Sequence, residues 1–230
     1  MEKVFVSVNG SRIKSAADRL IDGTWNEVTC LACGITYGLE SPLLFTDVPG
    51  HVWIAQHELS DRDRFAILET EADAIFSREF LERPPAAIRE QASSVRRRVC
   101  FGRRQLAEKL LARREGIDDR ALECLKLALM RDCIRELYPY GPTEFCLREI
   151  EGTSLKLIAT NIAEQRPVFE VVVPRQTLLN EKELAPFMPN FPELFTNLYV
   201  NASRYWTGGS DQPFLEHSEA LSCRSAISRC

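Results

Sequence analysis

Residues 29–34 read Thr-Cys-Leu-Ala-Cys-Gly, and the fold expected for the chain depends on this stretch. Two cysteines separated by two residues and followed by Gly34 are typical of a tight turn that aims two sulfurs at one metal ion. A redox-active pair would instead begin a helix, whose N-terminus lowers the pKa of the first thiol. The flanking residues are β-like, so the pattern favours a metal-binding turn between two strands.

The turn supplies only half of a metal site. A structural zinc ion takes four protein ligands, and Cys30 and Cys33 provide two. His51 and His57 follow at a spacing that imitates a site of two cysteines and two histidines. Residues 52–56 are predicted to form a strand, however, which would hold the two histidines about 20 Å apart at ~3.3 Å per residue. The residues therefore favour two reduced thiols in a vestigial turn over a fully protein-ligated zinc ion in this chain.

Two further segments make the sequence recognisable. Residues 41–47 read Ser-Pro-Leu-Leu-Phe-Thr-Asp, and residues 114–126 look like a helix with an acidic cap. With the cysteine turn, they resemble the second half of the CpXC domain, a bacterial and archaeal family, and we expect the similarity to cover residues 4–206. The resemblance implies a zinc-ribbon scaffold with a first CPxC pair just before the strand that begins at Lys3, and this sequence lacks that pair. It also implies a proline at the position of Leu31 in the second turn. Either the natural chain begins upstream of Met1, or this lineage lost its zinc site and kept the scaffold.

The composition is that of an ordinary globular protein. Of the 230 residues, 45% are hydrophobic and 27% are charged, and the net charge of −4 gives no general attraction to nucleic acid or anionic membranes. No apolar run approaches the roughly 18 residues that span a bilayer, and the N-terminus lacks the apolar block of a signal peptide. We therefore predict a cytoplasmic protein without membrane contact. The other six cysteines are expected to be reduced and structural: Cys100, Cys124, Cys133, Cys146, Cys223 and Cys230.

The sequence pattern predicts an α+β fold. Its expected parts are a small β-rich, zinc-ribbon-derived head (residues 1–57), a helical region (58–138), a β-hairpin and helix region (139–206) packed on the same body, and a disordered tail (207–230). Strands are expected at 3–8, 35–39, 43–47, 52–56 and 169–173, and helices at 11–21, from Asp118 onward, and at 194–206. Glu151-Gly152 is a hairpin signal that predicts a C-terminal antiparallel hairpin sheet.

One stretch of the helical region is strongly basic. Its candidate ligand-binding residues are Arg96, Arg97, Arg98, Arg103 and Arg104. These side chains could hold phosphates, with Phe101 stacking on a base. An ordinary solvated helix face fits the pattern better, because the whole chain is acidic. The stretch could equally form the rim of a protein interface.

The sequence offers little for catalysis, and we predict no catalytic residues. It contains no Gly-rich phosphate loop, no Gly-x-Ser-x-Gly elbow and no His-Glu-x-x-His helix. Cys100 with His57 could form a nucleophile system, and Glu69 with Asp73 could place two carboxylates side by side. An enzyme with an unrecognised site is therefore only the third hypothesis.

An aromatic segment gives the leading hypothesis. Phe187, Phe191 and Phe195 fill the core by default, or they expose a patch that binds a partner. Zinc-ribbon scaffolds commonly serve as contact surfaces, so the leading hypothesis is a non-enzymatic cytoplasmic module that recognises another protein, for which a neutralising or immunity-type partner fits. A nucleic-acid-associated regulator that uses the basic stretch is the alternative. The oligomeric state is left open.

Overall fold

The computed structural model describes residues 6–25, 27–38 and 41–205, and these form two compact units. Unit 1 contains the described residues up to 110 together with residues 197–199, and unit 2 contains residues 111–196 and 200–205. The chain leaves unit 1 within helix α4 (Gly102–Arg114) and later returns to it for three residues. Both units combine helices with a β-sheet, so the predicted α+β class is confirmed. The predicted tail lies outside the described residues.

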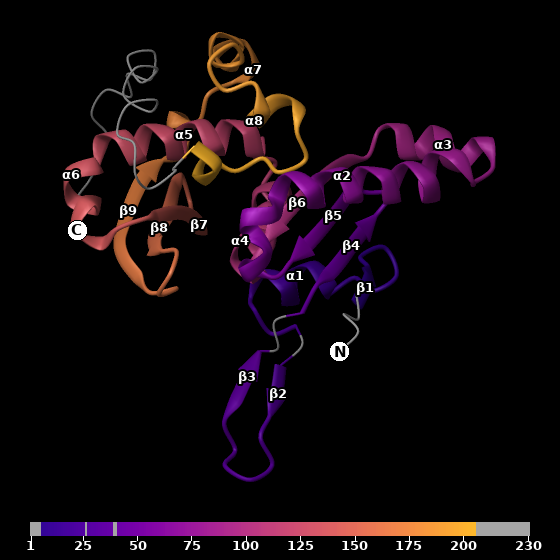
Figure 1. Cartoon of the computed structure of the whole chain (residues 1–230), viewed down its shortest axis with the longest axis horizontal. Helices are drawn as coiled ribbons and strands as arrows, with labels where there is room; N and C mark the ends of the chain where they lie inside the picture. Colours follow the sequence, from indigo (N-terminus) through magenta and orange to yellow (C-terminus); the bar gives the residue numbers. More distant parts are fainter. Residues whose placement is uncertain (1–5, 26, 39–40, 206–230) are drawn as a thin grey trace. The chain divides into compact units, whose positions relative to one another are not determined.

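A mixed four-stranded sheet forms the centre of unit 1. Its strands, in spatial order, are β1 (Val6–Asn9), β4 (Leu43–Asp47), β5 (Val52–His57) and β6 (Arg96–Phe101). β1 runs parallel to β4, β4 runs antiparallel to β5, and β5 runs parallel to β6 (Figure 1). The predicted strands at 43–47 and 52–56 are confirmed, with β5 one residue longer than expected.

Both faces of this sheet are covered. On one face, Phe45 and Ile54 pack with α1 (Ala16–Ile21) and α4, and on the other Trp53 packs with α2 (Phe65–Phe76) and α3 (Ala86–Ser93). Every residue of β5 is buried, as expected of a strand that is covered on both sides. The zinc-ribbon-derived head of the prediction is not confirmed, because β4 and β5 belong to this larger covered sheet.

Strand β6 corrects the prediction of an entirely helical middle region. Its register with β5 runs from Val52 opposite Arg96 to His57 opposite Phe101. Three consecutive arginines hide the strand in the sequence, because arginine favours helices and only the last three residues of β6 are buried. Pairing with the fully buried β5 outweighs that local preference.

The predicted helix at 194–206 is also wrong. Only α8 (Glu193–Thr196) and a 3-10 turn (Ala202–Tyr205) are helical. Between them, the carbonyl of Leu198 accepts a 3.0 Å hydrogen bond from the Val99 amide of β6, and the Glu69 carboxylate accepts one from the Tyr199 amide. These tertiary hydrogen bonds replace the intrahelical ones. Trp206 lies outside the described residues.

A separate hairpin carries the cysteine turn. Strands β2 (Glu27–Thr29) and β3 (Thr36–Gly38) form a two-stranded antiparallel sheet, and the hydroxyls of Thr29 and Thr36 are 2.8 Å apart across the pair. The prediction that the turn lies between two strands is therefore confirmed.

Unit 2 combines one long helix with an antiparallel sheet. The helix is α5 (Asp119–Asp132), and the sheet orders β7 (Thr143–Glu151), β8 (Ser154–Asn161) and β9 (Pro167–Pro174). The predicted hairpin is confirmed, and Gly152 takes the positive φ of 58° that its turn requires. The short helices are α6 (Ile134–Leu137) and α7 (Glu181–Leu184). A π-helical segment lies at Ser77–Glu82, and 3-10 segments lie at Leu59–Arg64, Tyr138–Tyr140, Arg175–Thr177 and Ala185–Phe187. Among the helices in the described ranges, none combines the length and apolar character needed to cross a membrane.

Helix α5 is buried nearly all round, as its sequence predicts. Residues 121–130 are all buried, including Glu123 and Lys126, whose side chains form an ion pair at 3.0 Å. Asp118 caps the start of the helix by accepting a 2.9 Å hydrogen bond from the Arg120 amide, and it pairs with the Arg120 guanidinium. Burial alone would raise the pKa of Asp118, but the hydrogen bonds from the Arg120 side chain and amide outweigh it, and the net pKa is lowered.

Replacing Asp118 with alanine should lower the free energy of unfolding by about 1–2 kcal/mol near pH 7, because the helix loses its cap. The folded-state pKa of Asp118 lies below its unfolded value of about 3.9, so its charge stabilises the fold above that value and stops doing so as the pH falls through the folded pKa. Denaturant titrations followed by circular dichroism from about pH 7 to pH 3 should show wild type and Asp118→Ala converging in acid. Asp118→Asn keeps the cap, so it should cost less, and an equal cost for both variants would contradict this account.

Candidate functional site

The cysteine turn has the local geometry of a metal-binding knuckle. The Cys30 amide donates to the Ile35 carbonyl and the Gly34 amide to the Cys30 carbonyl, each at 2.8 Å, which closes the turn. Gly34 has a φ of +73°, a conformation that side chains disfavour. The Cys30 sulfur accepts hydrogen bonds from the amides of Cys33 and Ala32 and from the Cys33 thiol, and these lower the pKa of Cys30. Cys33 is exposed and Cys30 is partly exposed.

The histidines do not complete this site. They occupy opposite ends of β5, as the strand prediction requires, with His51 just before it and His57 at its last residue. His51 Nδ1 lies 2.8 Å from Ser94 Oγ, and His57 is buried against the Phe101 ring with 5.8 Å between centroids. Within residues 6–25, 27–38 and 41–205, no three His, Cys, Asp or Glu side chains gather in a way that could hold a metal ion. The cysteine turn therefore fits half of a tetrahedral zinc site.

The other cysteines in the described part of the chain are buried. They are Cys100, Cys124, Cys133 and Cys146. Burial raises the pKa of Cys100, and it raises that of Cys124 to about 12, so both are inert thiols near neutral pH. Their burial agrees with the structural role predicted for them.

The basic residues divide between β6 and the start of α4 and do not share one helix face. Arg97 pairs with Asp73 of α2, and its guanidinium lies 5.2 Å from the centre of the Phe76 ring. Arg103 donates to the backbone carbonyls of Gly23 and Trp25. Arg98 donates to the Arg97 carbonyl at 2.8 Å, whereas Arg96 and Arg104 are exposed. At least Arg97 and Arg103 thus hold unit 1 together.

The residues considered for catalysis are not brought together. Cys100 packs in the cluster on the α1 and α4 face of the sheet, whereas Phe101 packs in the cluster on the opposite face. His57 stacks on Phe101, so Cys100 and His57 lie on different sides. The carboxylates of Glu69 and Asp73 also have separate partners, the Tyr199 amide and Arg97.

The predicted aromatic patch is mostly core. Phe187 and Phe191 are buried in unit 2, and Phe195 is partly exposed. Phe191 meets the Tyr205 ring edge-on at 5.2 Å, and the Tyr205 hydroxyl donates to Glu193. Core packing, the default expectation, holds for Phe187 and Phe191.

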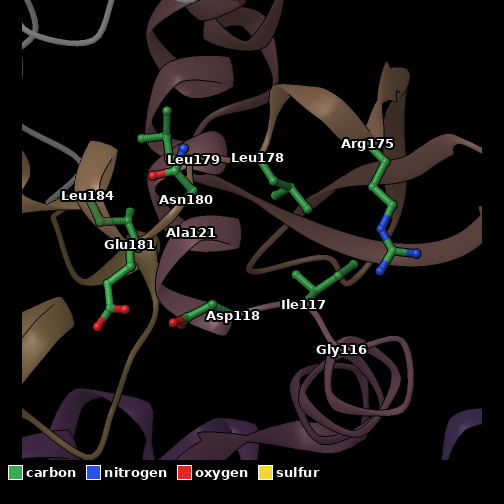
Figure 2. A pocket seen from close by; sticks show the side chains of 10 residues that line it. All are labelled: Gly116, Ile117, Asp118, Ala121, Arg175, Leu178, Leu179, Asn180, Glu181 and Leu184. Atoms are coloured by element: carbon green, nitrogen blue, oxygen red, sulfur yellow. The ribbon is translucent and has the colours of Figure 1, made fainter.

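Sequence reasoning missed a pocket of about 360 Å³ in unit 2. Two segments line it, the start of α5 and the chain that follows β9, and Figure 2 shows the residues: Gly116, Ile117, Asp118, Ala121, Arg175, Leu178, Leu179, Asn180, Glu181 and Leu184. Ile117 and Leu178 face one another from the two segments, and Arg175 and Glu181 lie on opposite sides (Figure 2).

Two of the residues that line this pocket are helix caps. Asp118 caps α5, and Asn180 caps α7 through the reciprocal bonds of a capping box with Glu183. Arg175 donates to the Glu115 carbonyl, which ties the second segment to the first. The residue types of the two caps can be recognised in the sequence. The sequence does not show that their two segments, about 60 residues apart, lie close together.

The family comparison covers the described residues of unit 1 up to residue 110 and the beginning of unit 2. The family model described as CpXC protein matches residues 2–126, a range that includes the cysteine hairpin, the four-stranded sheet and the first half of α5. The chain belongs to the CpXC family, as its cysteine turn and residues 41–47 predict. The matched range ends well before the predicted limit at residue 206. No curated protein and no solved structure gives a significant match.

Proposed function

We propose that this CpXC protein is a non-enzymatic, cytoplasmic binding module and that it recognises another protein through the pocket of unit 2. The observation that carries the proposal is the composition of that pocket. Ile117, Leu178, Leu179 and Leu184 give it an apolar lining, and Asp118, Arg175 and Glu181 bring charges of both signs. Interfaces combine apolar and charged side chains in this way, and a mixed pocket of this kind can take one anchoring side chain of the partner.

The same residues favour a protein over other ligands. Asp118 and Glu181 would repel phosphates, so the pocket does not suit nucleic acid. Asp118 and Asn180 already accept hydrogen bonds from helix amides, which makes them wall-forming groups and leaves them poorly suited to proton transfer. Leu178 and Leu179 are partly exposed, so an apolar side chain that covers them would remove apolar surface from water.

A matched pair of substitutions tests this proposal. Leu179→Glu places a charge in the pocket, and Met188→Glu places the same charge on an exposed methionine of unit 2 outside the pocket lining. Crosslinking in the protein's own cells, followed by affinity purification and mass spectrometry, should recover a partner with wild type and with Met188→Glu. Binding of the purified partner should weaken roughly 30-fold in Leu179→Glu, the loss expected for an anchor worth about 2 kcal/mol. Equal binding by both variants, or no partner in the crosslinked samples, would reject the proposal.

A further inference from the structure

The hairpin of β2 and β3 presents two metal-binding sulfurs at an accessible surface. Cys33 is exposed, Cys30 is partly exposed, and backbone amides already point at the Cys30 sulfur. Two backbone hydrogen bonds fix the turn between the strands. A zinc ion in a structural site takes four ligands in a tetrahedron, so an ion bound at this turn needs two more.

The chain surrounding the turn does not bring further ligands to it in the described ranges. Cys100, Cys124, Cys133 and Cys146 are each at most 7% exposed, and all lie in the cores of the two units. His51, just before β5, lies within hydrogen-bond distance of Ser94, and His57, at the end of β5, packs against the Phe101 ring. The simplest source of two more matched sulfurs is the same turn in a second copy of the chain. Two identical two-ligand halves, related by a two-fold axis through the metal, complete a tetrahedron.

The surface around the sulfurs suits contact between two identical turns. Leu31, between the cysteines, is fully exposed at 103%, and Ile35, just after the turn, is 63% exposed. Residues 28–38 contain no charged side chain, so two copies can approach without like-charge repulsion. Leu31 and Ile35 would then be covered beside the metal.

We propose that two copies of this protein share one zinc ion, bound by Cys30 and Cys33 of each copy. This inference goes beyond the proposed function, which uses the pocket of unit 2. The two proposals therefore fail independently.

The test uses the full chain, purified, reduced and stripped of metal. Zinc is added in steps, and native mass spectrometry reads the mass and the metal content together. The expected product is a dimer that carries one zinc ion per two chains and dissociates when a chelator removes the metal. Cobalt in place of zinc should give the visible absorption of a tetrahedral thiolate site. Mixing chains of two different isotopic masses should give a mixed dimer only when metal is present.

Two sets of variants identify which cysteines bind the zinc ion. Cys30→Ser and Cys33→Ser should each abolish the metal-linked dimer, whereas the double variant Cys223→Ser/Cys230→Ser should form it as wild type does. Leu179→Glu should also form it, which separates this test from that of the pocket. One zinc ion per monomer, a dimer that persists without metal in reducing buffer, no metal binding, or loss of binding in the Cys223→Ser/Cys230→Ser variant would each overturn the proposal.

Discussion

Replacing Glu123 with glutamine should lower the free energy of unfolding by about 3–5 kcal/mol, the cost of breaking a buried ion pair from one side. Glu123 Oε1 lies 3.0 Å from Lys126 Nζ, and the two side chains are 0% and 1% exposed. The other carboxylate oxygen accepts a 2.8 Å hydrogen bond from the Ala202 amide. Glutamine would replace the carboxylate that pairs with the buried ammonium group of Lys126 by a neutral amide, and it would weaken the attachment of residue 202 to α5.

Urea denaturation followed by far-ultraviolet circular dichroism measures this loss. The matched control is Glu79→Gln, the same change in a carboxylate that pairs with Arg78 and Arg83 at the surface. Exposed ion pairs contribute little, so the control should unfold at the wild-type midpoint. Equal midpoints for Glu123→Gln and Glu79→Gln would show that the buried pair does not stabilise unit 2.

A second large effect is expected at Trp53, where alanine should cost about 3–5 kcal/mol through loss of burial and creation of a cavity. The Trp53 side chain is 1% exposed, and it projects from β5 onto the Phe76 ring of α2, edge-on at 5.5 Å. Such aromatic pairs add to the effect of area burial. The change therefore removes a buried aromatic contact between β5 and α2.

The control for this prediction lies on the same helix. Ile67 of α2 is 54% exposed, so Ile67→Ala removes apolar atoms that are already in contact with water. Circular dichroism suits both variants, because Trp53→Ala removes a fluorescent residue. A shift in the urea midpoint of Trp53→Ala no larger than that of Ile67→Ala would contradict the packing described here.

The fold was predictable where the local pattern and the tertiary environment agree. β4 and β5 are apolar runs bounded by Pro42 and by Pro49-Gly50, and both were found at their expected positions. β6 was not predicted, because Arg96, Arg97 and Arg98 conceal a strand whose existence depends on pairing with β5. The helix prediction failed over residues 197–201 for the same reason, since the Tyr199 amide donates to Glu69 and the Leu198 carbonyl accepts from Val99 of β6.

The candidate sites also differ in how far the sequence could predict them. The cysteine turn is a local motif, so its position between two strands could be read from six residues. The pocket depends on the tertiary placement of the segments that carry Asp118 and Asn180, and ordinary residue types do not signal that placement. Phe187 and Phe191 follow the default expectation of core packing, but the dense aromatic composition did not by itself separate them from the partly exposed Phe195.

The return of residues 197–199 to unit 1 has a consequence for the order in which the protein is made. Tyr199 fills the same cluster as Trp53 and meets the Phe101 ring edge-on at 4.9 Å. Tyr199 is synthesised only after α5, the three-stranded sheet and α8. Unit 1 therefore begins first but cannot be completed until residues 111–196 of unit 2 have been made. A nascent chain that ends at residue 126, where the family match ends, lacks residues 197–199, so the edge of β6 should stay uncovered. Such a chain should need a chaperone, or the rest of the sequence, to avoid aggregation.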